Sequence, residues 1–253
     1  MGQILKTPKS DLLFKSSAGH EVHRHENNIF IRYNKEMLAF STSQLNGGIN
    51  KIDYSFNHQL SKWIETVDDL PGGSLKNYLA YNSEILGLEG NRSTGLITSA
   101  SMDNVAIIHE VLGDASLFAV VTGGASVNAA RAGDSASYDE TSFGRFVPVA
   151  GTINIMLVLE FSIPVEGLAR TAIVVTEAKT AAMQELNVKS CFSEGVATGT
   201  GTDGLIAACH NDDEYSFSDV GTHSRLGELI SRIVKKGVTE ALIKDGIEGV
   251  KTR

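Results

Sequence analysis

Hydrophobic and polar residues follow two different periods along the chain, and the changes of period divide it into strands and helices. Short runs that alternate or stay apolar, bounded by Gly, Asn and Ser, predict strands at residues 28–33, 37–42, 93–100, 116–124 and 151–160. The polar link "NKE" between the first two predicts an amino-terminal hairpin. The run "INIMLVL" within the last is the clearest buried strand.

Apolar residues return every three or four positions in other stretches, which predicts helices. These stretches cover residues 58–67, 101–112, 165–186 and 223–246. Ser101 is a candidate N-cap of the second helix, Pro164 stands where a proline can open the third, and Gly246 ends the fourth. Between the strands, residues 126–134 predict a short helix or turn, and the acidic, Ser-rich residues 134–142 predict an exposed loop.

The segment "ATGTGTDG" at residues 197–204 interleaves three threonines with two glycines. Since successive side chains of a strand point to opposite faces, it predicts a strand with the threonines on one face and a bare face that another group approaches closely. Its closing Asp-Gly pair predicts a two-residue turn into a second strand, "LIAAC", at residues 205–209.

Strands and helices alternate in the middle and the carboxyl half, and hairpins are predicted at both ends. This order favours an α+β fold in which a mixed β-sheet is covered by helices, and a layered αββα sandwich is one arrangement that meets it. With 253 residues and 42% hydrophobic content the chain can bury one sizeable core, so we expect a single domain over residues 1–253. Residues 1–27 are expected to be a more loosely attached amino-terminal segment.

Charge and the absence of long apolar runs exclude several classes of partner. A net charge of −8 without a basic stripe argues against nucleic acid. No apolar run is long enough to span a bilayer, and the opening residues lack the apolar region of a secretory signal, so we expect a cytoplasmic protein that does not bind membranes. In that reducing compartment Cys191 and Cys209 are expected to be two buried thiols.

Most strong catalytic motifs are absent from the sequence, which has no phosphate-binding loop, no zinc-type CxxC pair, no HExxH and no GxSxG. The histidines of "HEVHRH" at residues 20–25 lack acidic partners at fixed geometry, so a solvated loop is expected there rather than a metal site. We therefore expect neither a metal nor a cofactor.

Polar residues flanked by glycine gather instead at the ends of the predicted strands, where a rigid sheet can hold binding residues. Their many amides and hydroxyls, with few charges, suit a ligand rich in neutral amide groups. Taken singly, each residue also fits an ordinary turn or cap. The candidate binding residues are Asn46, Asn128, Asp134, Asn154, Thr198, Thr200 and Thr202.

Six segments in a fixed order carry a family resemblance: "NRSTGLITSASMDN", "VTGGASVNAARAGD", "GTINI", "TEAKTAAMQEL", "ATGTGTDG" and "THSRLGELI". Together they resemble the adenosylcobinamide amidohydrolases (CbiZ-like) of corrinoid salvage, over about residues 45–242. The resemblance implies hydrolysis of the amide that joins the aminopropanol arm to the corrin ring, giving adenosylcobyric acid and 1-amino-2-propanol. Corrinoids are broad rings fringed with carboxamides, which agrees with the candidate binding residues.

Amide hydrolysis needs an activated nucleophile, donors for the developing oxyanion and an acid for the leaving amine. Glu177 or Asp203 are candidates to activate water, and Lys179 or His223 to protonate the amine. A threonine nucleophile is the alternative, because the Gly-Thr pair at residues 151–152 and two later pairs resemble the junctions of self-cleaving amidases.

The sequence leaves two other functions open, a non-catalytic corrinoid-binding protein and an amidase that acts on another substrate. Both would use the same amide-rich surface, because a shared scaffold does not fix a substrate. The oligomeric state is also open, a homodimer included.

Overall fold

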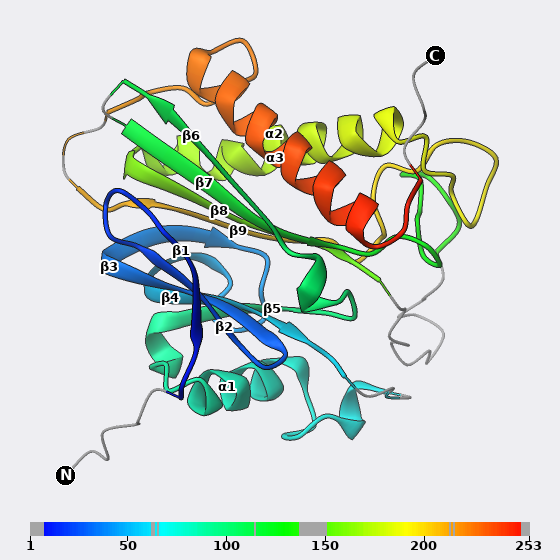
Figure 1. The fold of residues 1–253 in the computed structure, drawn as a ribbon, viewed down its shortest axis with the longest axis horizontal. Helices are drawn as coiled ribbons and strands as arrows, with labels where there is room; N and C mark the ends of the chain where they lie inside the picture. The colour runs from blue at the N-terminus through cyan, green and yellow to red at the C-terminus, as the bar shows by residue number, and fades with distance from the viewer. Residues whose placement is uncertain are drawn as a thin grey trace.

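The computed structural model describes residues 8–61, 64, 66–113, 115–136, 151–212, 214 and 216–248. These residues form a nine-stranded mixed sheet with three α-helices and three short 3-10 turns (Figure 1). The strands are β1 (Asp11–Lys15), β2 (Glu21–His25), β3 (Asn28–Ser41), β4 (Gly48–Gln59), β5 (Ser93–Thr98), β6 (Ala106–Leu112), β7 (Ala115–Gly123), β8 (Ile153–Ser162) and β9 (Gly204–His210). The helices are α1 (Leu75–Ile85), α2 (Val165–Glu185) and α3 (Arg225–Lys244), and the 3-10 turns are η1 (Val67–Asp69), η2 (Gly90–Arg92) and η3 (Met102–Asn104).

The long strand β3 joins two layers of the sheet. Its residues 28–32 pair with β2, its residues 37–41 pair with β9, and β4 lies along its other edge. The order of strands is β1-β2-β3-β9-β8-β7-β6, with β5 beside β4. The pairs β4–β5 and β8–β9 are parallel and the others are antiparallel, so the sheet is mixed as predicted.

Three apolar clusters show how the layers stack. One fills the space between the layer of β1–β5 and the layer of β6–β9, and includes Met37, Phe118 and Val158. A larger cluster lies between β6–β9 and the helices α2 and α3, and a smaller one lies between β3, β4 and α1. Helices therefore cover both outer faces of the paired layers (Figure 1), and the predicted α+β fold, in its αββα form, is confirmed.

Strand β8 shows why its sequence is apolar at nearly every position. Its odd-numbered residues from Ile153 to Leu159 face α2 and α3, whereas Met156 and Val158 face the other sheet layer. Strands β7 and β9 divide in the same way. A strand buried on both faces needs apolar side chains on both, and this is why the strands predicted at 116–124 and 151–160 are confirmed.

The amino-terminal third differs from the prediction. The two strands expected at 28–33 and 37–42 are one strand, β3, with a shift in its pairing to β4 between Arg32 and Met37. The "NKE" link is thus an irregularity within a strand and not a turn. Residues 11–25, expected to be loosely attached, instead form β1 and β2, and Val22 is fully buried against the neighbouring layer.

Two predicted helices are wrong. His58 and Gln59 end β4, while residues 62, 63 and 65 of that predicted helix lie outside the described residues. The helix of this region begins later, at α1, where the Ser74 hydroxyl accepts the Asn77 N–H. Ser101 does cap a helix, but only the 3-10 turn η3; the apolar run after it forms β6, because its seven residues pair with β7.

The two carboxyl-terminal helices are confirmed. Pro164 precedes the first residue of α2, and Gly246, with φ of 93°, follows α3. In the part of the chain that the structure describes, no helix is both long and apolar enough to cross a bilayer. Both cysteines are free: Cys209 is buried as expected, whereas Cys191 is exposed.

Candidate functional site

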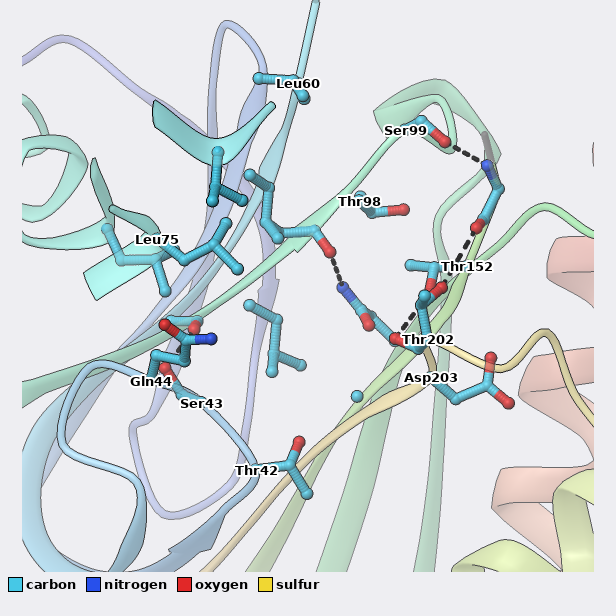
Figure 2. Close-up of a pocket in the computed structure, with 18 of the residues that line it drawn as sticks. Thr42, Ser43, Gln44, Leu60, Leu75, Thr98, Ser99, Thr152, Thr202 and Asp203 are labelled. Carbon is cyan, nitrogen blue, oxygen red and sulfur yellow. Dashed lines mark hydrogen bonds between the residues drawn. The ribbon is translucent and has the colours of Figure 1, made fainter. Parts of the chain in front are cut away.

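A cavity of about 260 Å³ opens between the two sheet layers, where β5, β8 and β9 meet near α1. One wall is apolar and includes Leu75, Leu79 and Leu96. The opposite wall carries hydroxyl groups and backbone from loops that are far apart in sequence (Figure 2). The residues of this polar wall are Thr42, Thr98, Ser99, Gly151, Thr152, Asn154, Thr202, Asp203 and Gly204, whereas Ser43 and Gln44 line the cavity on the side of Leu75 (Figure 2).

Thr152 and Thr202 form the centre of the polar wall. The Thr152 hydroxyl lies 2.8 Å from the Thr202 hydroxyl and donates to the Thr202 carbonyl oxygen, also at 2.8 Å. Asn154 lies beside them, where its amide donates to Asn57 Oδ1 at 2.8 Å and to the Ile97 carbonyl at 3.0 Å. The buried amides thus hold the start of β8 against β4 and β5, since a buried polar group must be paired.

Asp203 holds the loop before β9 in place. Its backbone lines the cavity, but its carboxylate points toward the helices (Figure 2), where Lys179 of α2 donates to it. The carboxylate also accepts the Ile153 N–H at 3.0 Å, the Thr200 N–H at 3.2 Å and the Thr200 hydroxyl. A carboxylate with this many donors is suited to fixing the wall of the cavity rather than to activating a water inside it.

The threonine–glycine segment is a loop in the structure and not a strand, and the Asp-Gly pair does not turn a hairpin because β9 begins there and runs parallel to β8. The three threonines also do not share a face. Thr198 accepts the Ala132 N–H, Thr200 donates to Asp203, and only Thr202 of the three lines the cavity. The hydrogen bonds that the threonines make with separate loops outweigh the preference for a strand that the alternation of threonine and glycine predicts.

Gly199 shows why this segment contains glycine. A Cβ atom placed on it would lie 2.3 Å from Asp203 Oδ2 and 2.5 Å from Lys179 Nζ. We expected another group to pack closely against the glycines of this segment, and at Gly199 that group is the Lys179–Asp203 ion pair.

Replacing Gly199 with Ala should destabilise the fold by about 1–3 kcal/mol, because the added methyl group must displace the Lys179–Asp203 pair. Urea unfolding would measure the change. The matched control is Gly167→Ala in α2, where the nearest atom to the new Cβ is 3.6 Å away, and it should not destabilise. Equal stability of the two variants would contradict the packing described for Gly199.

Several predicted site residues lie away from the cavity. Glu177 is on the exposed face of α2, two residues from Lys179. The His223 side chain is 72% exposed and pairs with Asp219 at 3.0 Å, in the loop before α3, whereas Asp203 precedes the opposite end of β9. The structure therefore does not bring Glu177 or His223 together with the other candidates.

Other predicted binding residues stabilise turns around the site. Asn46 donates to the carbonyls of Gly90 and Ser93 and has φ of 51°, as turn asparagines often do. Asp134 accepts from the hydroxyls of Ser190 and Ser193 and from a backbone N–H, and these hydrogen bonds lower the pKa of its carboxyl group.

Asn128 lies directly behind the polar wall. It is 1% exposed, and its amide nitrogen donates to the carbonyl oxygen of Gly151, which lines the cavity. Of the eleven candidates, Asn154, Thr202 and Asp203 line the cavity themselves, and Asn128, Lys179 and Thr200 contact residues of its wall.

Sequence reasoning missed the wall residues that come from the first layer and from β5. These are Thr42, Ser43, Gln44, Thr98 and Ser99. A signal for them was present, because Thr42 ends one predicted strand and Thr98 lies two residues before the end of another, and the predicted binding residues also gather at strand ends.

The histidine cluster is part of the sheet, so the solvated loop expected at residues 20–25 is wrong. His20 is fully buried, with its Nδ1 accepting the Asn34 N–H at 3.1 Å, and the His23 ring stacks on Phe30. Within the described ranges, no three side chains of His, Cys, Asp or Glu are placed to hold a metal ion.

Comparisons with known proteins place these features in context. The family model described as "Adenosylcobinamide amidohydrolase" (CbiZ) matches residues 13–248. An uncharacterized protein of Methanocaldococcus jannaschii is 34% identical over 230 residues, which cover 85% of this chain and 86% of the relative. An adenosylcobinamide amidohydrolase of Methanosarcina mazei is 28% identical over 220 residues, which cover 85% and 90%.

Two solved structures are more distantly similar. A protein of Pyrococcus horikoshii OT3 matches with a TM-score of 0.44 and 11% identity over 95% of this chain and 83% of its own. The L-aminopeptidase D-Ala-esterase/amidase of Ochrobactrum anthropi matches with a TM-score of 0.40 and 10% identity, over 93% and 82%.

Proposed function

We propose that this chain, which belongs to the adenosylcobinamide amidohydrolase family, hydrolyses the amide between the aminopropanol arm and the corrin ring of adenosylcobinamide. Water is added across the C–N bond, and the products are adenosylcobyric acid and 1-amino-2-propanol. We place this reaction in the cytoplasm, as a step that returns a corrinoid to cobalamin synthesis. The Methanosarcina mazei relative of the same name supports the choice of substrate.

The observation that carries the proposal is a cavity with one apolar wall and one wall of hydroxyls and amides. An amide carbonyl that becomes tetrahedral needs hydrogen-bond donors around its oxygen. The Thr202 hydroxyl lies at this wall, and the Asn128 amide lies directly behind it, where it donates to the Gly151 carbonyl. The apolar residues opposite, such as Leu75 and Leu79, suit the methyl and methylene groups of an aminopropanol arm.

The size of the cavity limits which part of the substrate enters. At about 260 Å³ it lies below the range of roughly 300–1,000 Å³ that encloses drug-sized ligands. The arm and its amide therefore occupy the cavity, while the corrin ring with its carboxamides stays at the mouth.

Incubation of the purified protein with adenosylcobinamide should release adenosylcobyric acid and 1-amino-2-propanol, both detected by mass spectrometry. Simple primary and secondary amides serve as the comparison panel, because an amidase for another substrate would prefer one of them. Binding of adenosylcobinamide without release of either product would instead indicate a corrinoid-binding protein.

The position of the arm is tested by narrowing the cavity. Leu75→Trp fills space at the apolar wall and should raise KM for adenosylcobinamide by about tenfold or more, in line with the 1–3 kcal/mol that such packing is worth. Tyr81→Trp, at an exposed position of the same helix, is the matched control and should leave KM unchanged. Equal KM values for both variants would place the arm elsewhere.

A further inference from the structure

The peptide bond between Gly151 and Thr152 lies in the wall of the cavity, just before the first residue of β8. Gly151 has φ of 92°, and a Cβ atom on it would lie 2.7 Å from Asn128 Oδ1, so this position requires glycine. Its N–H donates to the Ser99 hydroxyl. Thr152 is 3% exposed, and its hydroxyl is held by Thr202 at 2.8 Å. The bond is thus fixed on both sides.

The carbonyl oxygen of Gly151 accepts from two side chains. The Asn128 amide donates to it, and the Thr202 hydroxyl lies 3.5 Å from it. Asn128 is buried, and within the described residues its Oδ1 atom has no hydrogen-bond partner. Two convergent side-chain donors on one peptide carbonyl are the arrangement that stabilises negative charge on that oxygen.

We propose that the Thr152 hydroxyl cleaves the Gly151–Thr152 bond, and that the freed Thr152 is the nucleophile of the amide hydrolysis. In the first step Oγ adds to the Gly151 carbonyl carbon, the C–N bond breaks, and the proton lost by Oγ goes to the Thr152 nitrogen, leaving an ester. One water then hydrolyses the ester, giving a carboxylate on Gly151 and an amino-terminal Thr152 with a free hydroxyl. No oxidant, reductant or other co-reactant is consumed.

The second half of the inference rests on the proposed function. The new α-amino group, with an ordinary pKa of about 8, takes the proton from the Thr152 hydroxyl as this attacks the substrate amide. Asn128 and Thr202, which hold the Gly151 oxygen in the intact chain, then hold the substrate oxyanion. The proton passes to the leaving 1-amino-2-propanol, and water hydrolyses the acyl ester to adenosylcobyric acid.

Two other Gly–Thr pairs of the chain, at residues 199–200 and 221–222, lie in different surroundings. The Gly199 carbonyl accepts the Ala130 N–H at 2.8 Å, in a main-chain bridge. The Gly221 carbonyl accepts from Ser224, the residue that caps α3, and Thr222 is exposed and outside the cavity. Thr222 is therefore a matched control that shares the dipeptide but not the site.

Intact-mass analysis of the purified chain tests the cleavage. The wild type should appear as residues 1–151 and 152–253, with masses that sum to the full length plus one water, and the smaller fragment should begin with the sequence TINIM. Thr152→Ala should stay at full length, Thr152→Ser should be cleaved, and Thr222→Ala should be cleaved like the wild type. Asn128→Ala should slow cleavage by about a hundredfold, as the loss of an oxyanion donor does.

Three outcomes would overturn the cleavage. These are a wild type that stays intact, cleavage of Thr152→Ala at the same bond, or an unchanged rate in a folded Asn128→Ala. Circular dichroism of each variant shows whether it has folded, and the slowed cleavage expected of Asn128→Ala keeps the test valid if Thr152→Ala does not fold.

The role of Thr152 in hydrolysis is tested separately by rapid quenching during turnover of adenosylcobinamide. The fragment 152–253 should gain the mass of the adenosylcobyric acyl group, and the 1–151 fragment should not. If the intact chain hydrolyses adenosylcobinamide, the inference fails and the proposed function stands. If the cleaved chain does not hydrolyse it, self-cleavage stands and the proposed function fails.

Discussion

Asp203→Asn should lower the free energy of unfolding by about 3–5 kcal/mol and reduce turnover by at least about a hundredfold. The Lys179 and Asp203 side chains are only 12% and 16% exposed, so the variant leaves a poorly solvated ammonium without its counter-charge. The carboxylate of Asp203 now accepts hydrogen bonds from the Ile153 and Thr200 N–H groups. The NH2 group of an asparagine would place a second donor opposite at least one of these donors. Since Ile153 follows Thr152 directly, its displacement moves the hydroxyl wall.

Lys179→Met should cost less, because Thr200 and Ile153 still donate to the remaining carboxylate. The double variant should be more stable than the sum of the two single losses predicts, as for residues in direct contact. Urea unfolding gives the stabilities, and kcat and KM show whether the loss lies in kcat, as expected of residues that position the wall.

The surface pair Lys235–Glu185 provides the control for these variants. Its side chains are 41% and 59% exposed at a separation of 2.8 Å, and Lys235→Met should change stability by less than about 1 kcal/mol. If Asp203→Asn were as mild as Lys235→Met, Asp203 would not be the residue that holds this loop.

Acid should destabilise the protein between pH 6.5 and pH 4, well before its paired carboxylates are protonated. Burial lowers the pKa of His58 to about 4, and burial together with the nearby Lys35 and His20 lowers the pKa of His210 to about 4. Below pH 6.5 the unfolded chain binds protons that these folded rings do not, so stability falls as pH falls. By pH 5 each ring should remove about 2 kcal/mol from the free energy of unfolding.

His58→Gln tests this directly. The neutral His58 ring donates to Asn28 Oδ1 and accepts from the Tyr78 hydroxyl, each at 2.8 Å, and glutamine keeps a donor and an acceptor there without the titration. The variant should lose about 2 kcal/mol less than the wild type between pH 7 and pH 5, as measured by urea unfolding.

Leu79→Ala is the control for the pH experiment. It opens a cavity in the apolar cluster between β3, β4 and α1. The free energy of unfolding should fall by about 2–5 kcal/mol, equally at both pH values. An equal fall in stability for His58→Gln and the wild type would mean that burial does not lower the pKa of the His58 ring.

The sequence alone was sufficient to predict an element wherever the burial of that element is visible in the pattern of its own apolar residues. Continuous apolar runs identified β7 and β8, and helical spacing with a proline before and a glycine after identified α2 and α3. The order of short polar motifs was also sufficient for the family, because residues 13–248 match its model.

The sequence misled where a local pattern competes with a distant partner. The run of β6 fits a helix by spacing, but its hydrogen bonds go to β7. The "NKE" link fits a turn by composition, but neighbouring strands pair with β3 on both sides of it, at residues 28–32 and 37–41, and the strand continues through it. In each case the pairing energy of another segment outweighs a weak local preference.

The residues of the candidate site could likewise be predicted only in part from the sequence. The sequence by itself determined which polar residues are available, Asn128, Asn154, Lys179 and Asp203 among them, and that they lie in or next to buried elements. Only the tertiary structure decided that Lys179 meets Asp203, that Glu177 and His223 lie elsewhere, and that Gly151 presents its carbonyl to Asn128. The reason is physical: these contacts join residues more than twenty positions apart, and their geometry is set by how the two sheet layers and α2 pack, which no single segment encodes.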